Sequence, residues 1–432
     1  MNDALLTAPV AAPASSNIEN RPAMRKRYVR PISALERYSL VLHGAYRYHV
    51  DGIVEGVGTV DPLVLQAAVD RAAAANPAIR VRLRGVLKWC RWVDGGRAPR
   101  VRVQALSAWD GSSEQNAPFL DERLKPRQAV ADILLVPCTD GRTRIVFRTL
   151  HAAIDGRGCI HWMTEVCRAL RGEPLQGSDS VLTDLDVQDL YADKIPPDSD
   201  IPPQHCIPVL LPQAGAAEGA AGPLRYLWRR VLLDRDVPQL LTKAAAWLAE
   251  RARQNGPGEV GFTIPVDYRG FRIQEMGIGN LTGYLRLVVA EGASARSLMV
   301  QLGHRIKAYA DCRSFPGIRA IVWLPVWWML RGLKPKINTV LYTVTPALPT
   351  GGVVSMGSLK PEQFDFPGFK AERSYGIPGA VGKLNLIFVN YPDHVCVSFA
   401  SPAAFNDHGQ FDALVTAFQQ HFSSPHSAGR ST

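Results

Sequence analysis

The feature that most constrains the fold is a strand that runs into a tight loop and then a helix, within the first half of the chain. Residues 129–137 and 143–150 are predicted to form two strands joined by a turn at Thr139-Asp140-Gly141. The run His151-Ala-Ala-Ile-Asp155-Gly156-Arg-Gly158 follows directly, and an amphipathic helix begins after it. Elsewhere strands and helices also mix without strict strand–helix–strand alternation. This pattern favours two α/β sandwiches over a doubly wound sheet.

A chain of 432 residues is too long for one compact core, so we expect two lobes. The stretch from Pro212 to Pro223 is nearly of low complexity, which is typical of a linker or surface loop. The expected organisation is a disordered tail at 1–30, a first lobe at 31–195, a linker at 196–225, a second lobe at 226–425 and a tail at 426–432.

Local signals place the elements within the two lobes. Ser33, with Glu36 three residues later, predicts a capped helix start, and Asp61-Pro62 opens another helix. In the second half we expect strands at 226–233, 260–266, 284–289, 338–344 and 353–355, helices at 237–253, 295–309 and 410–422, and a hairpin at 383–390 and 394–400.

Composition excludes several classes of protein. Apolar residues make up 47% and charged residues 20%, as in ordinary globular domains. The formal charge of +10 favours anionic partners, but no repeated basic motif with interleaved aromatics is present, so we do not expect nucleic acid as a partner. The seven cysteines form no CxxC pair, which argues against a disulfide framework and a zinc site. We expect buried free thiols and no bound metal.

The sequence gives no sign of a membrane span or a secretory signal. No apolar run reaches the length of a transmembrane helix. The stretch from Met1 to Asn20 lacks a basic region ahead of an apolar one. We therefore expect a cytoplasmic protein.

His151 is the candidate catalytic residue, because it ends a strand at a glycine-containing loop and precedes a helix N-terminus. Its imidazole could take a proton from an alcohol or amine, since its ordinary pKa lies near neutrality. The free N–H groups of the helix could receive negative charge. Asp155 could pair with a cation and pin the loop, or cap the helix. The pattern is short, and a loop histidine beside an N-cap aspartate is the simpler interpretation of these residues alone.

Five blocks of sequence, in order along the chain, change this balance. They are Arg30 to Glu36, Val60 to Val69 with Asn76 to Arg80, His151 to Gly156, Ile264 to Arg269 with Gly279-Asn280, and Val353 to Gly357. Together they resemble the superfamily that holds chloramphenicol acetyltransferase, non-ribosomal peptide synthetase condensation domains, wax ester synthases and alcohol acetyltransferases. The run at His151 matches the HxxxDG motif of that superfamily, and the resemblance extends from about Pro31 to Phe422.

The resemblance implies two chloramphenicol acetyltransferase-like α/β sandwich lobes with a tunnel between them. A thioester donor and a nucleophile would enter this tunnel from opposite faces. The implied site residues are catalytic His151 and Gly156, structural Asp155 paired with Arg269, and the tunnel residues Ser355 and Asn280. No bound cofactor is implied, because acyl-CoA or a phosphopantetheinyl carrier protein, acting in trans, would be a substrate.

Two departures from the superfamily bear on function. Leu150 stands where many relatives carry a first histidine, which weakens the match to peptide-forming condensation domains. The final Asp-Phe-Gly-Trp-Gly segment is not evident, and Asp365-Phe366 is a poor substitute, which bears on donor recognition. We expect an acyltransferase that makes an ester or amide on a small-molecule or lipid-like acceptor, in specialised-metabolite or lipid biosynthesis. The alternative is a catalytically idle scaffold that docks carrier proteins.

An apolar segment at 320–336 stands apart from the rest of the chain. It contains Trp323, Trp327 and Trp328, and the basic residues Arg331, Lys334 and Lys336 follow. The simpler interpretation is a buried part of the second lobe. The alternative is an element that contacts an acyl chain or lies at a membrane surface, with its basic residues at the wet edge.

Overall fold

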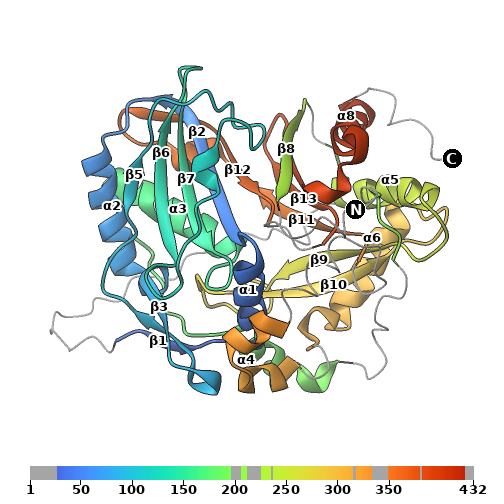
Figure 1. Ribbon diagram of the computed structural model, residues 1–432, viewed down its shortest axis with the longest axis horizontal. Coiled ribbons are helices and arrows are strands. Elements are labelled where there is room, and N and C mark those ends of the chain that lie inside the picture. The colour runs from blue at the N-terminus through green and yellow to red at the C-terminus, as the bar shows by residue number, and fades with distance from the viewer. Residues whose placement is uncertain are drawn as a thin grey trace.

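The computed structural model describes residues 27–195, 206–211, 225–234, 237–314, 318–332, 349–379 and 382–423. These residues form two α/β lobes that lie side by side, each with one main β-sheet (Figure 1). The two-lobe α/β architecture expected from the sequence is therefore confirmed.

The first lobe has a five-stranded sheet in the order β12-β2-β7-β6-β5. Its strands are β2 (His49–Gly58), β5 (Val101–Val103), β6 (Ala131–Pro137), β7 (Thr143–Leu150) and β12 (Phe369–Ile377). The helices α2 (Pro62–Ala75) and α3 (Gly156–Leu170) pack on each other and against this sheet. The first core lies between them, where the rings of Phe147 and Trp162 meet edge to face.

The described chain begins with a strand of a small sheet and then a capped helix. The sheet has the order β1-β4-β3, with β1 (Val29–Pro31), β3 (Val81–Arg84) and β4 (Arg91–Asp94). The helix α1 (Ala34–Ala45) begins after Ser33 with the capping box expected from Glu36. The expected disordered tail at 1–30 is wrong at its end, because β1 pairs with β4 and Arg30 is buried in an ion pair with Glu36. Residues 1–26 lie outside the described residues.

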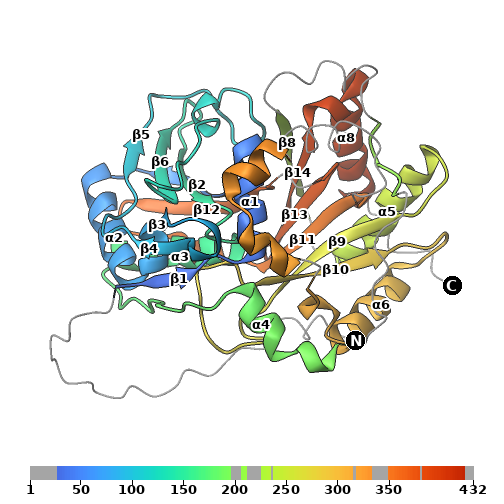
Figure 2. The ribbon, with the colours of Figure 1, turned by 60° about the horizontal axis from the view of Figure 1, so that its bottom comes forward.

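The second lobe has a six-stranded sheet in the order β10-β9-β11-β13-β14-β8. Its strands are β8 (Tyr226–Leu233), β9 (Gly261–Asp267), β10 (Thr282–Val288), β11 (Gly351–Ser358), β13 (Asn385–Asn390) and β14 (Val395–Pro402). Figure 2 shows the helices α5 (Leu240–Gln254), α6 (Ala295–Lys307) and α8 (Gln410–Ser423) on the side of this sheet away from the first lobe. Their apolar faces and the strands enclose the second core. The short helix α4 (Asp184–Leu190) precedes this lobe in the chain.

One strand crosses from the second half of the chain into the first lobe. β12 follows β11 in sequence but pairs antiparallel with β2, after which the chain returns to the second sheet as β13. The expected second lobe at 226–425 is therefore not continuous. β12 has a register shift between Ala371 and Arg373, and this irregularity breaks the alternation by which a strand is recognised in a sequence.

The expected linker also contains ordered core residues. Cys206 forms an isolated bridge to Glu259, and the three residues Ile207, Val209 and Leu210 are buried in the second core. Apolar burial on the second lobe thus holds this part of the expected linker in place. Residues 196–205 and 212–224, the expected strand at 338–344 and the tail at 426–432 lie outside the described residues.

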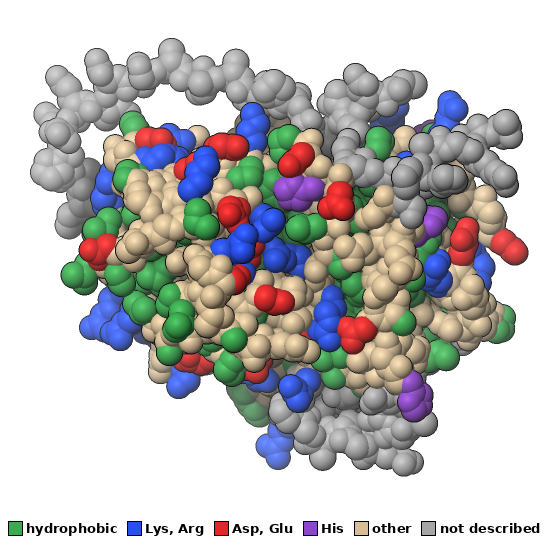
Figure 3. Space-filling view, turned by 90° about the horizontal axis from the view of Figure 1, so that it is seen from above, with side chains coloured by type: hydrophobic (Ala, Val, Ile, Leu, Met, Phe, Trp, Pro, Cys, Tyr) green, Lys and Arg blue, Asp and Glu red, His purple; other side chains and the backbone are tan. Residues whose placement is uncertain are grey.

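The seven cysteines are all buried and none is in a disulfide. Among the described residues, no helix has both the length and the apolar character needed to cross a bilayer. On the face seen from above, basic and acidic side chains are interspersed (Figure 3).

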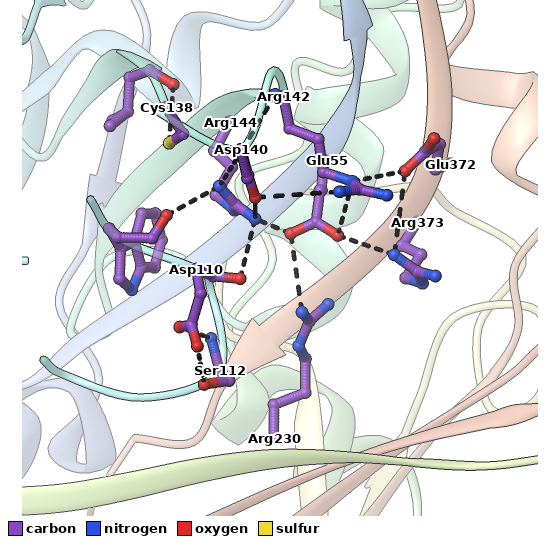
Figure 4. Close-up of polar contacts among 12 residues, drawn as sticks. Glu55, Asp110, Ser112, Cys138, Asp140, Arg142, Arg144, Arg230, Glu372 and Arg373 are labelled. Atoms are coloured by element: carbon purple, nitrogen blue, oxygen red, sulfur yellow. Dashed lines mark hydrogen bonds and ion pairs between the residues drawn. The ribbon is translucent and has the colours of Figure 1, made fainter. Parts of the chain in front are cut away.

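A buried cluster of charges around Glu55 of β2 joins the two lobes (Figure 4). The Glu55 carboxylate accepts hydrogen bonds from Arg144 of β7 at 2.8 Å and from Arg373 of β12 at 3.0 Å. Arg142 also approaches this carboxylate at 4.0 Å, and Arg230 approaches it at 3.6 Å. Because Arg230 belongs to β8, the cluster ties the second sheet to the first.

Candidate active site

His151 lies directly after β7, where its imidazole is held between two parts of the chain. The backbone N–H of His151 donates to the carbonyl of Tyr48 at 3.4 Å. The His151 imidazole and the Tyr48 ring are stacked, with centroids 4.7 Å apart and an angle of 12° between their planes. Gly379, after β12, also lies beside the imidazole, since a Cβ at that position would be 3.3 Å from His151 Cδ2. The ring therefore has little freedom to turn.

The surroundings of His151 favour its neutral form. Burial lowers the pKa of the imidazole, and its own carbonyl, the Asp155 carboxylate and Asn280 offset this lowering only in part. Its Nδ1 is buried and makes no hydrogen bond of normal geometry to another residue in the described part of the chain. At neutral pH the ring is therefore unprotonated, which is the state that a general base requires.

Asp155 has both of the roles that the sequence left as alternatives, because it caps a helix and pairs with a cation. It is the N-cap of α3, where its Oδ1 accepts from Gly158 N at 2.8 Å. The same carboxylate pairs with Arg269 Nη2 at 3.0 and 3.1 Å. Its Oδ2 also accepts from Leu281 N and from Thr282 Oγ1, each at 2.9 Å. Asp155 thus fastens the loop after β7 to the second lobe.

Arg269 follows β9, and every nitrogen of its guanidinium makes at least one hydrogen bond. Nη1 donates to Asp267 at 2.6 Å, Nε donates to the carbonyl of Gly277 at 2.6 Å, and Nη2 also reaches the carbonyl of Gly279 at 2.5 Å. The side chain is buried. The fork of five donors therefore orders the 277–279 loop and binds Asp155 at the same time.

Asn280 holds the backbone of the histidine loop. Its Nδ2 donates to the carbonyl of His151 at 3.0 Å and to Glu36 Oε1 at 3.3 Å. Arg30, paired with Glu36, donates to the carbonyl of Ala153 at 3.0 Å. Asn280 was expected to line a tunnel; the structure places it, buried, as a support of the loop.

Two glycines allow the lobes to approach each other at the start of α3. A Cβ on Gly158 would lie 2.0 Å from the carbonyl oxygen of Ile278, so a side chain cannot be accommodated at this position. A Cβ on Gly156 would lie 3.0 Å from the methyl group of Met356 on β11. Ser355, the neighbour of Met356, is exposed, and its Oγ accepts from Gly357 N at 3.3 Å. The N-terminus of α3 thus faces the strand that carries Ser355.

Sequence reasoning missed the two residues that flank the imidazole, Tyr48 and Gly379. Neither lies in a recognisable motif, because Tyr48 precedes β2 and Gly379 follows β12, more than 300 residues later. Only the pairing of β2 with β7 and β12 brings them to His151. The importance of Gly158 for close packing was also missed, although this glycine stands in the motif itself.

An open hollow of about 560 Å³ lies at the other end of α3 from Asp155. Asp365 and Phe366, the poor substitute for the final Asp-Phe-Gly-Trp-Gly segment of the superfamily, are part of its lining. Arg171, the C-cap of α3, lies in it as well and donates to the carbonyls of Gln363 and Asp365. The hollow is thus separate from His151, and the tunnel between the lobes stays a prediction.

Comparison with known proteins places the fold in a class. No protein-family model and no curated protein matches the sequence. Solved structures do match. A mutant starter condensation domain of rhizomide synthetase RzmA, in complex with C8-CoA, aligns with a TM-score of 0.63 over 91% of this chain and 94% of that one, at 15% identity.

Two further condensation domains are similar to the same extent. The first condensation domain of the CDA synthetase aligns with a TM-score of 0.62 over 94% of this chain and 98% of that one, at 16% identity. The condensation domain of the Monacolin K polyketide synthase MokA aligns with a TM-score of 0.61 over 91% and 96%, at 12% identity. The chain therefore has the fold of condensation domains, which is the two-lobe fold that the resemblance in sequence implied.

Proposed function

We propose that the protein is an acyltransferase that moves an acyl group from a thioester to a hydroxyl or amine. The observation that carries this proposal is the position of His151: its imidazole is stacked on Tyr48 at the junction of the two lobes, and its burial there lowers its pKa. The N-terminus of α3 lies next to it. A base held beside a site for negative charge is the arrangement that acyl transfer needs.

In the proposed reaction one proton is transferred to His151 and returned, while one bond to the carbonyl carbon forms and another breaks. A ring nitrogen of His151 takes the proton of the acceptor, whose oxygen or nitrogen forms a bond to the thioester carbonyl carbon. The Asp155 cap uses Gly158 N, which leaves the N–H groups of Gly156 and Arg157 to stabilise the oxyanion of the tetrahedral intermediate. The C–S bond then breaks, and the imidazolium returns its proton to the departing thiolate.

The donor is proposed to be an acyl-CoA or an acyl group on a phosphopantetheinyl carrier protein that acts in trans. The complex of the RzmA starter domain with C8-CoA supports an acyl-CoA for this fold. The acceptor would be a small molecule or a lipid-like molecule, in specialised-metabolite or lipid biosynthesis. The proposed steps use no bound cofactor besides these substrates and the groups of the protein itself.

A scaffold without catalytic activity is the competing function, and Leu150, in place of a first histidine, is the observation that favours it. Release of free thiol from a panel of acyl-CoAs, measured with alcohols and amines as acceptors, separates the two. A catalyst releases one thiol for each ester or amide that it forms. A scaffold releases thiol no faster than buffer alone does.

The His151→Ala variant then tests the assignment of the base. Loss of a general base lowers turnover by roughly 10²–10⁴-fold, while the thermal unfolding profile should stay close to that of the wild type. His304→Ala is the matched control, because His304 is exposed on α6 in the second lobe. Equal turnover in the His151→Ala variant and the wild type would show that another group is the base.

A further inference from the structure

The nine tryptophans fall into two groups. Five are in the cores and are at most 5% exposed: Trp92, Trp109, Trp162, Trp228 and Trp247. The other four are 55% to 65% exposed: Trp89, Trp323, Trp327 and Trp328. The interpretation of the 320–336 segment as a buried part of the second lobe is therefore wrong for its tryptophans. We call the four exposed indoles, together with exposed Val86 and Leu324, the tryptophan face.

The tryptophan face is assembled from two segments that lie over 200 residues apart in sequence. One is the turn after β3, with Val86 and Trp89; the other comprises the 3₁₀ helix Ile318–Trp323 and the helix at 326–332. The ammonium group of Lys88 lies over the ring of Trp323, 4.2 Å from its centroid, and joins the two segments. Arg37 of α1 bonds the carbonyls of Leu87 and Leu324 and so also ties them together.

The inner side of the second segment fixes which side is exposed. Met329 is buried against Val41 and Leu42 of α1, and Leu330 fits against Gly44. Figure 2 shows this segment, in orange, crossing α1. Pro325 precedes the helix, and its carbonyl accepts from the N–H groups of Trp328 and Met329. The indoles of Trp327 and Trp328 therefore point away from a surface that is already packed.

The two segments that form the tryptophan face carry charges of one sign only. From Val81 to Val93 and from Ile318 to Gly332 the chain contains no Asp and no Glu. Lys88 and Arg331 are exposed at the face. The face in Figure 3, by contrast, mixes both signs. Lys334 and Lys336, expected as part of the basic edge, lie outside the described residues.

We propose that the tryptophan face binds the surface of an anionic lipid bilayer. Indole rings favour the interface between headgroups and acyl chains, where an apolar ring and a polar N–H are both satisfied. Basic side chains at the edge of such a face attract anionic headgroups. A cluster of exposed indoles with basic side chains, and with no carboxylate in either of its two segments, fits this surface better than it fits water. The inference goes beyond acyl transfer and does not depend on it.

Vesicle co-sedimentation of the full-length protein tests the proposal. The wild type should bind vesicles of phosphatidylcholine and phosphatidylglycerol at low salt, bind more weakly at high salt, and bind little to phosphatidylcholine alone. The triple variant Trp323→Ser/Trp327→Ser/Trp328→Ser should lower the partition coefficient at least tenfold. Failure of the wild type to bind the anionic vesicles at low salt would overturn the proposal.

The matched control removes two apolar side chains elsewhere on the first lobe. Leu63 and Leu106 are 81% and 67% exposed, so Leu63→Ser/Leu106→Ser removes exposed apolar surface outside the tryptophan face. This variant should bind vesicles like the wild type. Equal loss in both variants would mean that general apolar exposure drives binding, and the tryptophan face would then have no special part.

A second variant keeps all indoles and changes the charge. Lys88→Glu/Arg331→Glu should weaken binding to anionic vesicles and serves as the test if the triple variant does not fold by circular dichroism. Binding unchanged in this variant and in the triple variant would overturn the proposal. If, in addition, the triple variant slowed transfer from a carrier protein, the face would be a carrier docking site instead.

Discussion

Asp155 and Glu55 are both buried carboxylates that join the two lobes, yet different groups satisfy them. Asp155 accepts from two backbone N–H groups, a threonine hydroxyl and one guanidinium. Glu55 is approached by four guanidinium groups, those of Arg142, Arg144, Arg230 and Arg373, as Figure 4 shows. One carboxylate therefore fixes the path of a loop, and the other neutralises cations drawn from several strands.

The difference indicates which of the two carboxylates supports stability alone and which also supports the proposed chemistry. Neutral donors with fixed directions define geometry, so the Asp155 cluster orders the backbone that carries His151. Several cations around one carboxylate define a charge balance instead, because removal of the anion leaves them facing one another in a poorly solvated place. We expect substitutions at Glu55 to change stability and substitutions around Asp155 to change both stability and turnover.

The largest effect is expected for Glu55→Gln. This change keeps the size of the side chain but leaves its arginines without their shared anion, so the free energy of unfolding should fall by about 3–5 kcal/mol. Urea unfolding measures this loss. Turnover per folded molecule should stay within about twofold, an order-of-magnitude bound for a change that leaves the contacts of His151 in place.

Glu372→Gln is the control for this prediction. Glu372 pairs with Arg142 at 2.8 Å and approaches Arg373 at 3.9 Å, but it is 32% exposed. Water can therefore solvate the arginines after the change, and the loss should be about 1 kcal/mol or less. Similar losses for both glutamates would remove the distinction between a buried charge balance and a surface one.

A double-mutant cycle at Asp155 and Arg269 comes next in size. Asp155→Ala should cost about 2–3 kcal/mol of unfolding free energy, less than at Glu55, because Arg269 keeps Asp267 as a partner. The double variant should cost less than the sum of the single variants, with a coupling of about 0.5–3 kcal/mol. Strict additivity in urea unfolding would show that the pair is not an energetic unit. Asp155→Ala should also lower turnover, because the loop carries His151.

Substitution of Tyr48 should have a smaller effect, on turnover only, because Tyr48 contacts His151 and not the Glu55 cluster. Its ring stacks on His151, and aromatic pairs contribute about 0.5–1.5 kcal/mol beyond their buried area. Tyr48→Leu should therefore reduce kcat by about two- to tenfold with KM nearly unchanged, and Tyr48→Phe should restore it. If Phe fails to rescue kcat, the phenol hydroxyl rather than the stacked ring is the group that matters.

The comparison also explains what the sequence could reveal. Asp155 stands in a short motif, and its loop lies between a clear strand and a clear helix, so its place was predictable. Glu55 has partners up to 318 residues away, on β7, β8 and β12 and in the turn before β7, and no local pattern marks such a set. β12 was missed because a bulge breaks its alternation. The tryptophan face was left open, since an apolar segment gives the same signal whether it is buried or exposed.

The finest test is the pH dependence of kcat/KM. Burial lowers the pKa of His151 below the ordinary value of about 6.5, so the base stays unprotonated as the pH falls through that value. Activity should therefore persist at pH 6.5 and be lost only at lower pH.

The Asp155 carboxylate favours the imidazolium and so raises this pKa, against the larger effect of burial. Asp155→Asn removes the negative charge and should move the acid limb of the profile to still lower pH, while Glu55→Gln should leave the limb where it is. Movement of the limb to higher pH in Asp155→Asn would contradict the assignment of His151 as the titrating base, and an equal shift in Glu55→Gln would mean that the two carboxylates are not distinct in their effect on the site.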